Sequence, residues 1–499
     1  MSRSFWLAGL LMSRAAPVPA AELGVLAPVL ADGQPQMQDD PSGKPAPVVA
    51  RIGSGKLHER IQREARDGFL GTVLALDESA QRIAGEKTTK PTWLYLSAED
   101  GGFARRGFWL EENGKRRFVD ELFVDLVVDE DTIDDGGFEE IFAHEMGHVF
   151  LRRLMPGLPY GWSRTPHSSM SVTDYPTAFD EGFATHFQSL VRRYSRNPRL
   201  EERTLGLDAK PFVPLWLSNL DRAGRIDGVR RNLFVHQQLV PPGSDADAWS
   251  RANESTAFDM ARLRNGQQMM SSEGVIATLF HRWLVPGDGA REAIVSRYSR
   301  LFGTMAAAST RGWTMKPDTP VFLDLVEHYC GDVPAECARL RNLVLDITYG
   351  ATADVTLPRT TESMAARGRI GDMAGFVGGL KQARAQMAQL QASVADDPKR
   401  LRAMLGPDVW LLGHTPVKPP GLPSNEVAVN LNTAELEQLR TLPGIDAAIA
   451  ERALASRREK GAFADVADFA KRSGLDAAQA SALASAAEAL RKAGLNERR

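Results

Sequence analysis

The chain has 499 residues, which is too long for one small hydrophobic core, so roughly two to four domains are expected. Hydrophobic residues make up 43% and charged residues 25%, a composition that excludes an intrinsically disordered chain. The formal net charge of −3 excludes a global attraction to nucleic acid or acidic lipid, so any such binding must come from a local patch.

Residues 1–20 have the features of a secretory signal peptide. Arg3 supplies a positive charge, residues 5–12 form a short apolar core, and small residues precede Ala21. This pattern predicts cleavage near Ala20 and export, to the periplasm or outside the cell, rather than a cytoplasmic location. The alternative is an apolar tail on a cytoplasmic protein. No apolar run approaches the roughly 18 residues that span a bilayer, so no transmembrane segment is expected.

The next part of the chain predicts an α+β domain over residues 56–350. The preceding segment, 21–55, is rich in proline and polar residues and predicts a poorly ordered leader. A helix is expected over 56–67, and after Asp135 the hydrophobic period becomes helical. The domain should therefore hold a small N-terminal sheet followed mostly by helices. Between 70 and 130 the pattern is typical of strands, at 92–96, 106–110 and 121–128.

The C-terminal part divides into a spacer and a small all-α domain. Residues 351–424 predict a helical segment followed by a linker rich in proline, and residues 425–499 predict a bundle of short helices. The two cysteines, Cys330 and Cys337, have six residues between them. They form either a disulfide in an oxidising compartment or two free thiols.

The segment 138–154 contains the candidate metal ligands and the candidate catalytic base. His144 and His148 are four residues apart in a helical pattern, so their side chains leave one face of a helix. Two nitrogens in this arrangement can both reach one zinc ion at roughly 2.0–2.1 Å. Glu145 lies beside the first ligand, where its carboxylate can accept a proton from a water on the metal. A chance match is the alternative, but Gly147 and the apolar flanks favour a metal site.

Two histidines leave a catalytic zinc one protein ligand short. The best candidate is Glu181, on a predicted helix that begins near Pro176, because its helical neighbours are small and allow a close approach. The alternative for Glu181 is a charge that stabilises a helix N-terminus. Glu273 is a rival ligand, although it also suits the start of a helix. Three further residues are candidate oxyanion donors or plain helix and loop residues: His186, His167 and Tyr175.

The motif from His144 to His148, followed by Asp180-Glu-Gly-Phe-Ala184, resembles the gluzincin superfamily, which includes thermolysin and the zinc aminopeptidases. The resemblance covers residues 138–190 and departs in its longer spacing between His148 and Glu181. It implies a zincin-like fold and one zinc per chain, held by the two histidines and Glu181, with Glu145 as base. It also implies a peptide or protein substrate, aligned by a strand at 122–128.

Residues 430–476 resemble the tandem helix-hairpin-helix module of competence-type DNA receptors. The resemblance implies a hairpin at Pro443-Gly444-Ile445 whose backbone amides hold a DNA phosphate. Asp446 and Asp476 stand where that family has the final hairpin glycine. Residues 425–499 contain eleven basic and eleven acidic side chains, so their net charge is zero. Because non-specific DNA affinity comes from phosphate neutralisation, only weak DNA binding is expected, and a protein-docking role is favoured.

Two functions follow from these patterns. The first is a zinc metallopeptidase that hydrolyses peptide bonds with metal-activated water. The alternative is a non-catalytic, zinc-containing binding protein, associated with DNA through its helix-hairpin-helix module. The presence of Glu145 favours the enzyme, because a purely structural ion needs no base. One alternative is left for DNA binding, a local basic patch formed by Arg452, Arg457, Arg458 and Lys460.

Overall fold

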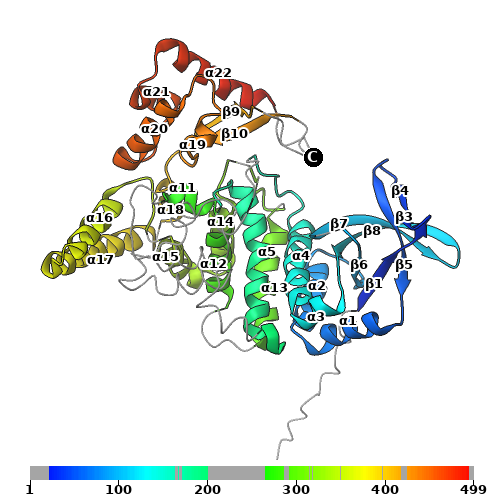
Figure 1. The fold of residues 1–499 in the computed structure, drawn as a ribbon. Coiled ribbons are helices and arrows are strands. Elements are labelled where there is room, and N and C mark those ends of the chain that lie inside the picture. Colours follow the sequence, from blue (N-terminus) through cyan, green and yellow to red (C-terminus); the bar gives the residue numbers. More distant parts are fainter. Residues whose placement is uncertain are drawn as a thin grey trace, which may run out of the picture.

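The protein combines a mixed sheet, a helical body and a small C-terminal module (Figure 1). No helix among the residues described is long and apolar enough to cross a membrane. The predicted signal peptide and most of the proline-rich linker lie outside the described residues. The computed structural model describes residues 22–99, 101–162, 167, 171–200, 264–285, 291–308, 310–313, 315–316, 318–348, 350–395, 397–416 and 424–493.

The sheet lies at one end of the molecule, in blue and cyan in Figure 1. Its strand order is β1-β6-β8-β7-β5-β4, and β1 also pairs with β5, which closes five of the strands into a ring. The inner apolar side includes Trp93, Phe108 and Phe123, all buried. The strands are β1 (Leu23–Pro28), β4 (Met37–Asp39), β5 (Pro45–Ile52), β6 (Thr92–Leu96), β7 (Gly102–Glu112) and β8 (Lys115–Leu126), with a small hairpin of β2 (Leu30–Ala31) and β3 (Gln34–Pro35).

The prediction of a poorly ordered leader over 21–55 was wrong, because β1 and β5 are integral strands of the ring. Along β5, Ala46 and Val48 are buried whereas Pro45 and Pro47 occupy the alternate, more exposed positions. Prolines placed in this way still allow the apolar residues of a strand to be buried. The prolines therefore made a strand look like a disordered segment, although buried and more exposed positions alternate along it.

Helices cover the other side of the sheet and form the body of the molecule. The helix predicted at 56–67 is α1 (Lys56–Asp67), but the next segment is also helical, as α2 (Leu70–Ile83), where strands were expected. Its buried face includes Leu70, Val73 and Leu74. The other helices of the body are α3 (Glu130–Asp134), α4 (Gly137–Leu154), α5 (Tyr175–Tyr194), α11 (Gly266–Met270), α12 (Glu273–Leu284), α13 (Arg291–Ala307), α14 (Val321–Asp332) and α15 (Cys337–Ile347).

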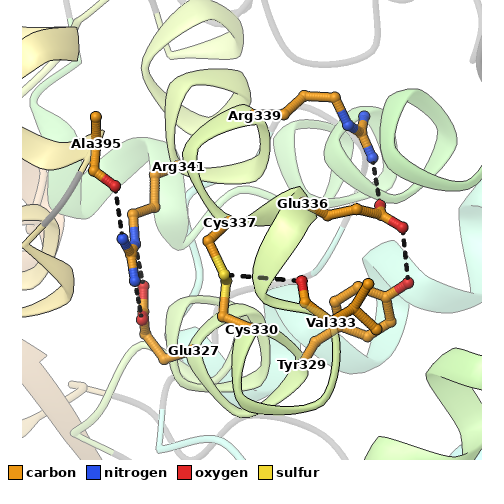
Figure 2. The surroundings of a disulfide bond; sticks show 9 residues. All are labelled: Glu327, Tyr329, Cys330, Val333, Glu336, Cys337, Arg339, Arg341 and Ala395. Atoms are coloured by element: carbon orange, nitrogen blue, oxygen red, sulfur yellow. Dashed lines mark hydrogen bonds and ion pairs between the residues drawn. A yellow bond between two sulfur atoms is a disulfide. The ribbon is translucent and has the colours of Figure 1, made fainter.

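A disulfide joins Cys330 at the end of α14 to Cys337 at the start of α15, across a single 3-10 turn, η4 (Pro334–Glu336) (Figure 2). Beside it, the buried guanidinium of Arg341 donates to both carboxylate oxygens of Glu327, at 2.9 and 2.8 Å. The cysteines are therefore paired, and an ion pair links the same two helices a second time.

The chain continues through a helical hairpin into the C-terminal module. The module has its own apolar core, which includes Leu431, Phe463 and Phe469. The expectation of an all-α domain was incomplete, because a two-stranded sheet belongs to it and packs against the last helix. The elements are α16 (Thr356–Arg369), α17 (Met373–Ala395), α18 (Pro398–Ala403), β9 (Trp410–His414), β10 (Glu426–Asn430), α19 (Leu436–Leu439), α20 (Ala447–Lys460), α21 (Val466–Ser473) and α22 (Ala477–Ala493).

Candidate metal centre and C-terminal hairpins

The helices α4 and α5 pack side by side and carry the predicted ligands. Their close approach depends on Gly147, since a Cβ atom on this residue would lie 2.6 Å from the Cα of Ala184. On α5, Phe179, Phe183 and Phe187 are fully buried. Because these phenylalanines fix the rotation of α5, the opposite side of the helix faces the histidines of α4.

Three predicted ligands meet between these helices. The Nε2 atoms of His144 and His148 lie 3.7 and 3.5 Å from Oε2 of Glu181. These distances are long for hydrogen bonds. Two ligands of one tetrahedral zinc ion, each roughly 2.0–2.1 Å from it, lie about 3.4 Å apart. The separations therefore suit atoms that share an ion.

The Oε2 atom of Glu181 provides the test of whether a metal fits. It is buried and has no hydrogen-bond donor. Burial raises the pKa of this carboxyl, but the facing His144 and His148 outweigh that effect and hold the pKa below its ordinary value. A buried carboxylate oxygen without a donor is costly unless a cation neutralises it. Two imidazoles and a carboxylate are a usual zinc donor set, so the residues fit a zinc ion.

Asp180 orients one of the histidines and was not foreseen from the sequence. His148 donates its Nδ1 hydrogen to Oδ1 of Asp180 at 2.7 Å. This bond leaves Nε2 as the nitrogen that faces Glu181, an arrangement common among metal-binding histidines. Burial disfavours the charged form of His148, but Asp180 and Glu181 raise its pKa well above the usual value. The sequence feature that could have indicated this role is the position of Asp180 directly before the predicted ligand Glu181.

Glu145 lies beside the first residue of β7. It is buried, and burial raises the pKa of its carboxyl despite the opposing effect of His144. A Cβ atom on Gly102 would lie 2.8 Å from Oε1 of Glu145, so a side chain at this position would displace the Glu145 carboxylate. Sequence reasoning missed Gly102, because nothing local relates it to the histidine motif.

The strand that could align a substrate is β7 rather than the segment 122–128. Residues of β8 pair with β6 on one side and with β7 on the other, so β8 is internal and that prediction was wrong. Along 102–106, β7 pairs with β8, and its other side has no strand partner among the described residues. A guanidinium hydrogen of Arg152 is donated to the carbonyl of Ala104.

His167 and Glu273 lie at the edge of the ligand group. His167 Nδ1 donates to Oε2 of Glu273 at 3.4 Å and is 3.6 Å from Oε2 of Glu181. This hydrogen bond to Glu273 raises the pKa of His167. The other oxygen of Glu273 accepts a hydrogen bond from the hydroxyl of Thr185 at 2.8 Å, and Glu273 is the first residue of α12. Glu273 belongs to a group with His167 and Glu181, not to the group with the paired histidines.

His186 and Tyr175 do not offer donors to this site, which corrects their candidate role as oxyanion donors. His186 donates Nδ1–H to the carbonyl of Phe183, and its Nε2 accepts from the hydroxyl of Tyr298 at 2.6 Å. Complete burial holds the pKa of His186 well below its usual value, so the ring is neutral and both nitrogens are engaged. The Tyr175 hydroxyl donates instead to Asp408 at 3.1 Å.

The C-terminal module presents two similar hairpins side by side. Gly444 has a positive φ of 76°, and its carbonyl accepts at 3.0 Å from Nε2 of Gln479, in the first turn of α22 directly after the second hairpin at 474–476. Pro443 and Ile445 flank it, with Ile445 in the module's core. Asp446 and Asp476 are exposed and cap the following helices, accepting from backbone amides at 2.8 Å each. Part of the helix N-terminus that would receive a phosphate is therefore occupied by a carboxylate.

Two arginines of the predicted local basic patch donate hydrogen bonds to backbone carbonyls of the module itself. Arg457 donates to the carbonyl of Leu431 at 2.7 Å, and burial lowers its pKa to about 10. Arg452 donates to the carbonyl of Ser473 at 3.0 Å. The Arg457 guanidinium therefore stabilises the module internally and is withdrawn from the patch, whereas Arg452 remains exposed.

Comparison with known proteins identifies this module and nothing else. A family model described as a helix-hairpin-helix motif matches residues 424–487. No curated protein and no solved structure matches the chain. The match makes nucleic acid a candidate partner of the C-terminal module.

Proposed function

We propose that the protein is a zinc-dependent peptidase. The observation that carries the proposal is the convergence of His144 and His148 on the buried Oε2 of Glu181, which has no hydrogen-bond donor. One zinc per chain would be held by these three residues. When bound, zinc would polarise a substrate carbonyl and lower the pKa of a water molecule.

The chain's own residues supply the remaining chemistry of this proposal. Glu145 accepts a proton at a carboxylate whose pKa is raised by burial, which suits a base that must later release the proton. The Nδ1 hydrogen bond to Glu273 raises the pKa of His167, and the protonated ring can donate its Nε2 hydrogen to a developing oxyanion. Asp180 fixes the ring orientation of His148.

We propose that the substrate is an extended peptide that pairs with β7. Over 102–106, the side of β7 away from β8 has no strand partner among the described residues, and a peptide that pairs there would replace Arg152 at the carbonyl of Ala104. Gly102 places this segment directly against the Glu145 carboxylate. Main-chain pairing with a strand edge fixes a peptide without selecting its sequence. The segment can therefore align a peptide bond beside the base.

The test combines metal analysis with peptide cleavage. Purified wild-type protein, never exposed to chelators, should carry one zinc per chain and cleave members of a peptide library. Glu145→Gln should retain the zinc but lose about 100- to 10,000-fold in turnover, since only the base is removed. Glu112→Gln, at the far end of β7, is the matched control and should behave as wild type. Wild-type protein without stoichiometric metal would contradict the proposal.

A second candidate function rests on the family match to residues 424–487. In this alternative the protein is a non-catalytic, zinc-containing binding protein that associates with nucleic acid through its hairpins. Gly444 and Gly474 are exposed in the full chain, as such a role requires. Duplex DNA binding by a protein that retains zinc but cleaves no peptide would favour this function over the peptidase.

We also propose that the protein is exported. The disulfide between Cys330 and Cys337 supports this proposal, because disulfides persist in oxidising compartments and are rare in the cytosol. Cell fractionation followed by N-terminal sequencing tests it. A mature N-terminus near Ala21 in the exported fraction is expected, and an uncleaved protein confined to the cytosol would contradict it.

A further inference from the structure

The C-terminal module contacts the body of the protein where the ligand-bearing helix α5 begins. Tyr175, the first residue of α5, is buried and donates its hydroxyl hydrogen to Oδ1 of Asp408 at 3.1 Å. Asp408 lies between α18 and β9, and its Oδ1 also accepts from Nδ2 of Asn430 at 2.9 Å. Asn430 is the last residue of β10, within the helix-hairpin-helix match.

The same face of the module holds α11, the short helix that leads into α12. Nδ2 of Asn265 donates to the carbonyl of Asn432 at 2.7 Å, and Nε2 of Gln268 donates to the carbonyl of Thr433 at 3.1 Å. Figure 1 shows α11 directly beneath the module, beside α18. The hairpin residues Gly444 and Gly474 lie outside this contact and stay exposed.

The beginnings of α5 and α12 are also joined to each other. The amide of Thr173 donates to the carbonyl of Ser271 at 2.8 Å, one residue before the α5 cap and two residues before α12. Further along, a Cβ atom on Gly182 would lie 2.7 Å from the carbonyl oxygen of Glu273. Through buried and part-buried hydrogen bonds, the module therefore contacts the start of α5, which presents Glu181, and α11, which leads into the helix that presents Glu273.

A shift of the start of α5 should move Glu181, the proposed metal ligand, by nearly the same distance. Glu181 follows Tyr175 by six residues, about 9 Å along the helix axis. Just beyond Glu181, α5 is packed on α4 at Gly147 and on α12 at Gly182, with no room for one methyl group. Packed helices of this kind shift as rigid bodies rather than deform.

We propose that Tyr175 and Asp408 are positioning residues for the zinc site, and that docking of the helix-hairpin-helix module and binding of zinc stabilise each other. This inference rests on the proposed zinc site, and it assigns the module a role in that site independent of nucleic acid. Because binding linkage is reciprocal, zinc must tighten the docking contact as much as the contact tightens zinc.

The reciprocal effect is measurable by amide hydrogen exchange of the full-length protein, with zinc and with a chelator. Zinc should slow exchange in segments 405–412 and 430–434, which contain no metal ligand, by about fivefold or more. Exchange in β4, which pairs only with β5 at the far end of the sheet from the module (Figure 1), is the internal control and should not change. Slowing confined to segments around α4, α5 and α12 would overturn the inference while leaving the zinc site intact.

A conservative variant tests the two named residues. Tyr175→Phe keeps the buried ring and removes only the hydroxyl that binds Asp408. It should weaken zinc affinity about three- to tenfold, in line with one lost hydrogen bond, and reduce the effect of zinc on segment 430–434. Tyr329→Phe, which removes a hydroxyl contact to Glu336 far from the docking face, is the matched control. Unchanged zinc affinity and unchanged exchange response in Tyr175→Phe would overturn the assignment. Wild-type protein that binds no zinc would instead refute the proposed function, and with it the inference.

Discussion

Gly147 of α4 lies directly against Ala184 of α5, so closely that a Cβ atom on the glycine would be 2.6 Å from the Ala184 Cα. Backbone, not a flexible side chain, is the obstacle, and it cannot rotate away. The distance between the histidines and Glu181 therefore depends on the absence of one methyl group.

Gly147→Ala should destabilise the protein by about 1–3 kcal/mol, because relief of the contact requires the helices to separate. An alanine inside a helix normally stabilises by about 0.5–1 kcal/mol relative to glycine, so the expected sign is opposite to helix propensity. Gly303→Ala is the matched control, since a Cβ atom on this helical glycine meets no atom within 4 Å. Denaturant unfolding of both variants checks the prediction. Equal stabilisation by both would contradict it.

The assignment of the third ligand predicts opposite results for two glutamates. Glu181→Ala should weaken zinc binding more than the roughly 10- to 100-fold typical of residues that only orient a ligand. Glu273→Ala should leave the metal in place, because its oxygens contact His167 and Thr185. Zinc affinity is measured by competition with a chromophoric chelator. Metal loss in the Glu273 variant alone would reverse the assignment.

Asp408 should make stability fall as pH rises. Burial raises the pKa of its carboxyl to about 7, with Asp318 adding to this effect and Tyr175, Asn430 and Arg402 opposing it. The folded state therefore binds a proton that the unfolded state loses near pH 4. The resulting stability is present in full below that pH and disappears as pH rises through 7. Its size is at most about 4 kcal/mol.

Thermal melting between pH 4 and 8 checks this expectation. Asp408→Asn, which cannot ionise, should show a smaller decline than wild type and should be the more stable protein at pH 8. Asp39→Asn, at an exposed position in β4, serves as the control and should retain the wild-type profile. Identical profiles for wild type and Asp408→Asn would show that the carboxyl is not protonated in the folded protein.

The full-length protein should bind duplex DNA weakly at physiological salt. Asp446 and Asp476 place negative charge at the hairpins, and the module has no net charge. Replacing both with glycine should raise DNA affinity, most strongly at low ionic strength. The substitutions should cost only a few tenths of a kcal/mol each as helix caps.

Asp465→Gly controls for the loss of a capping carboxylate, because Asp465 caps α21 away from the hairpins. Fluorescence anisotropy with labelled duplex, at two salt concentrations, compares the three proteins. An equal gain in DNA affinity for Asp465→Gly would show that net charge, and not negative charge at the hairpins, limits binding. Tight and salt-sensitive binding by the wild type would show that the hairpins hold phosphate despite the two carboxylates.

Local patterns predicted the parts of the site that depend on helix geometry. The spacing of His144 and His148 places both on one face of α4, and helical periodicity placed Glu181 opposite the buried phenylalanines of α5. The structure brings these three residues together. Gly102 could not be predicted in the same way, because its contact with Glu145 arises from how the sheet packs on α4.

Non-local pairing also explains the errors in the fold. The ring closes because β1 reaches β6 and β5 reaches β7, partners about sixty or more residues apart in a chain whose local composition indicated a disordered leader. Helix α2 lies within the range 70–130, where strands were expected, since an apolar run buried on most sides lacks a clear helical period.

The segment 102–106 of β7, which has only one strand partner among the described residues, also favours aggregation of the protein. A strand edge that accepts a peptide accepts equally well the edge of a second chain, which is how aggregates begin. The ring closes most of the other edges, and β7 breaks its regular pairing at a bulge between Arg106 and Phe108, at Gly107. Arg105 and the exposed Arg106 add charge to this segment, paired with Asp125 and Asp120. Replacing Arg106 with valine should therefore promote aggregation of a protein that is still folded, because its partner Asp120 is also at the surface.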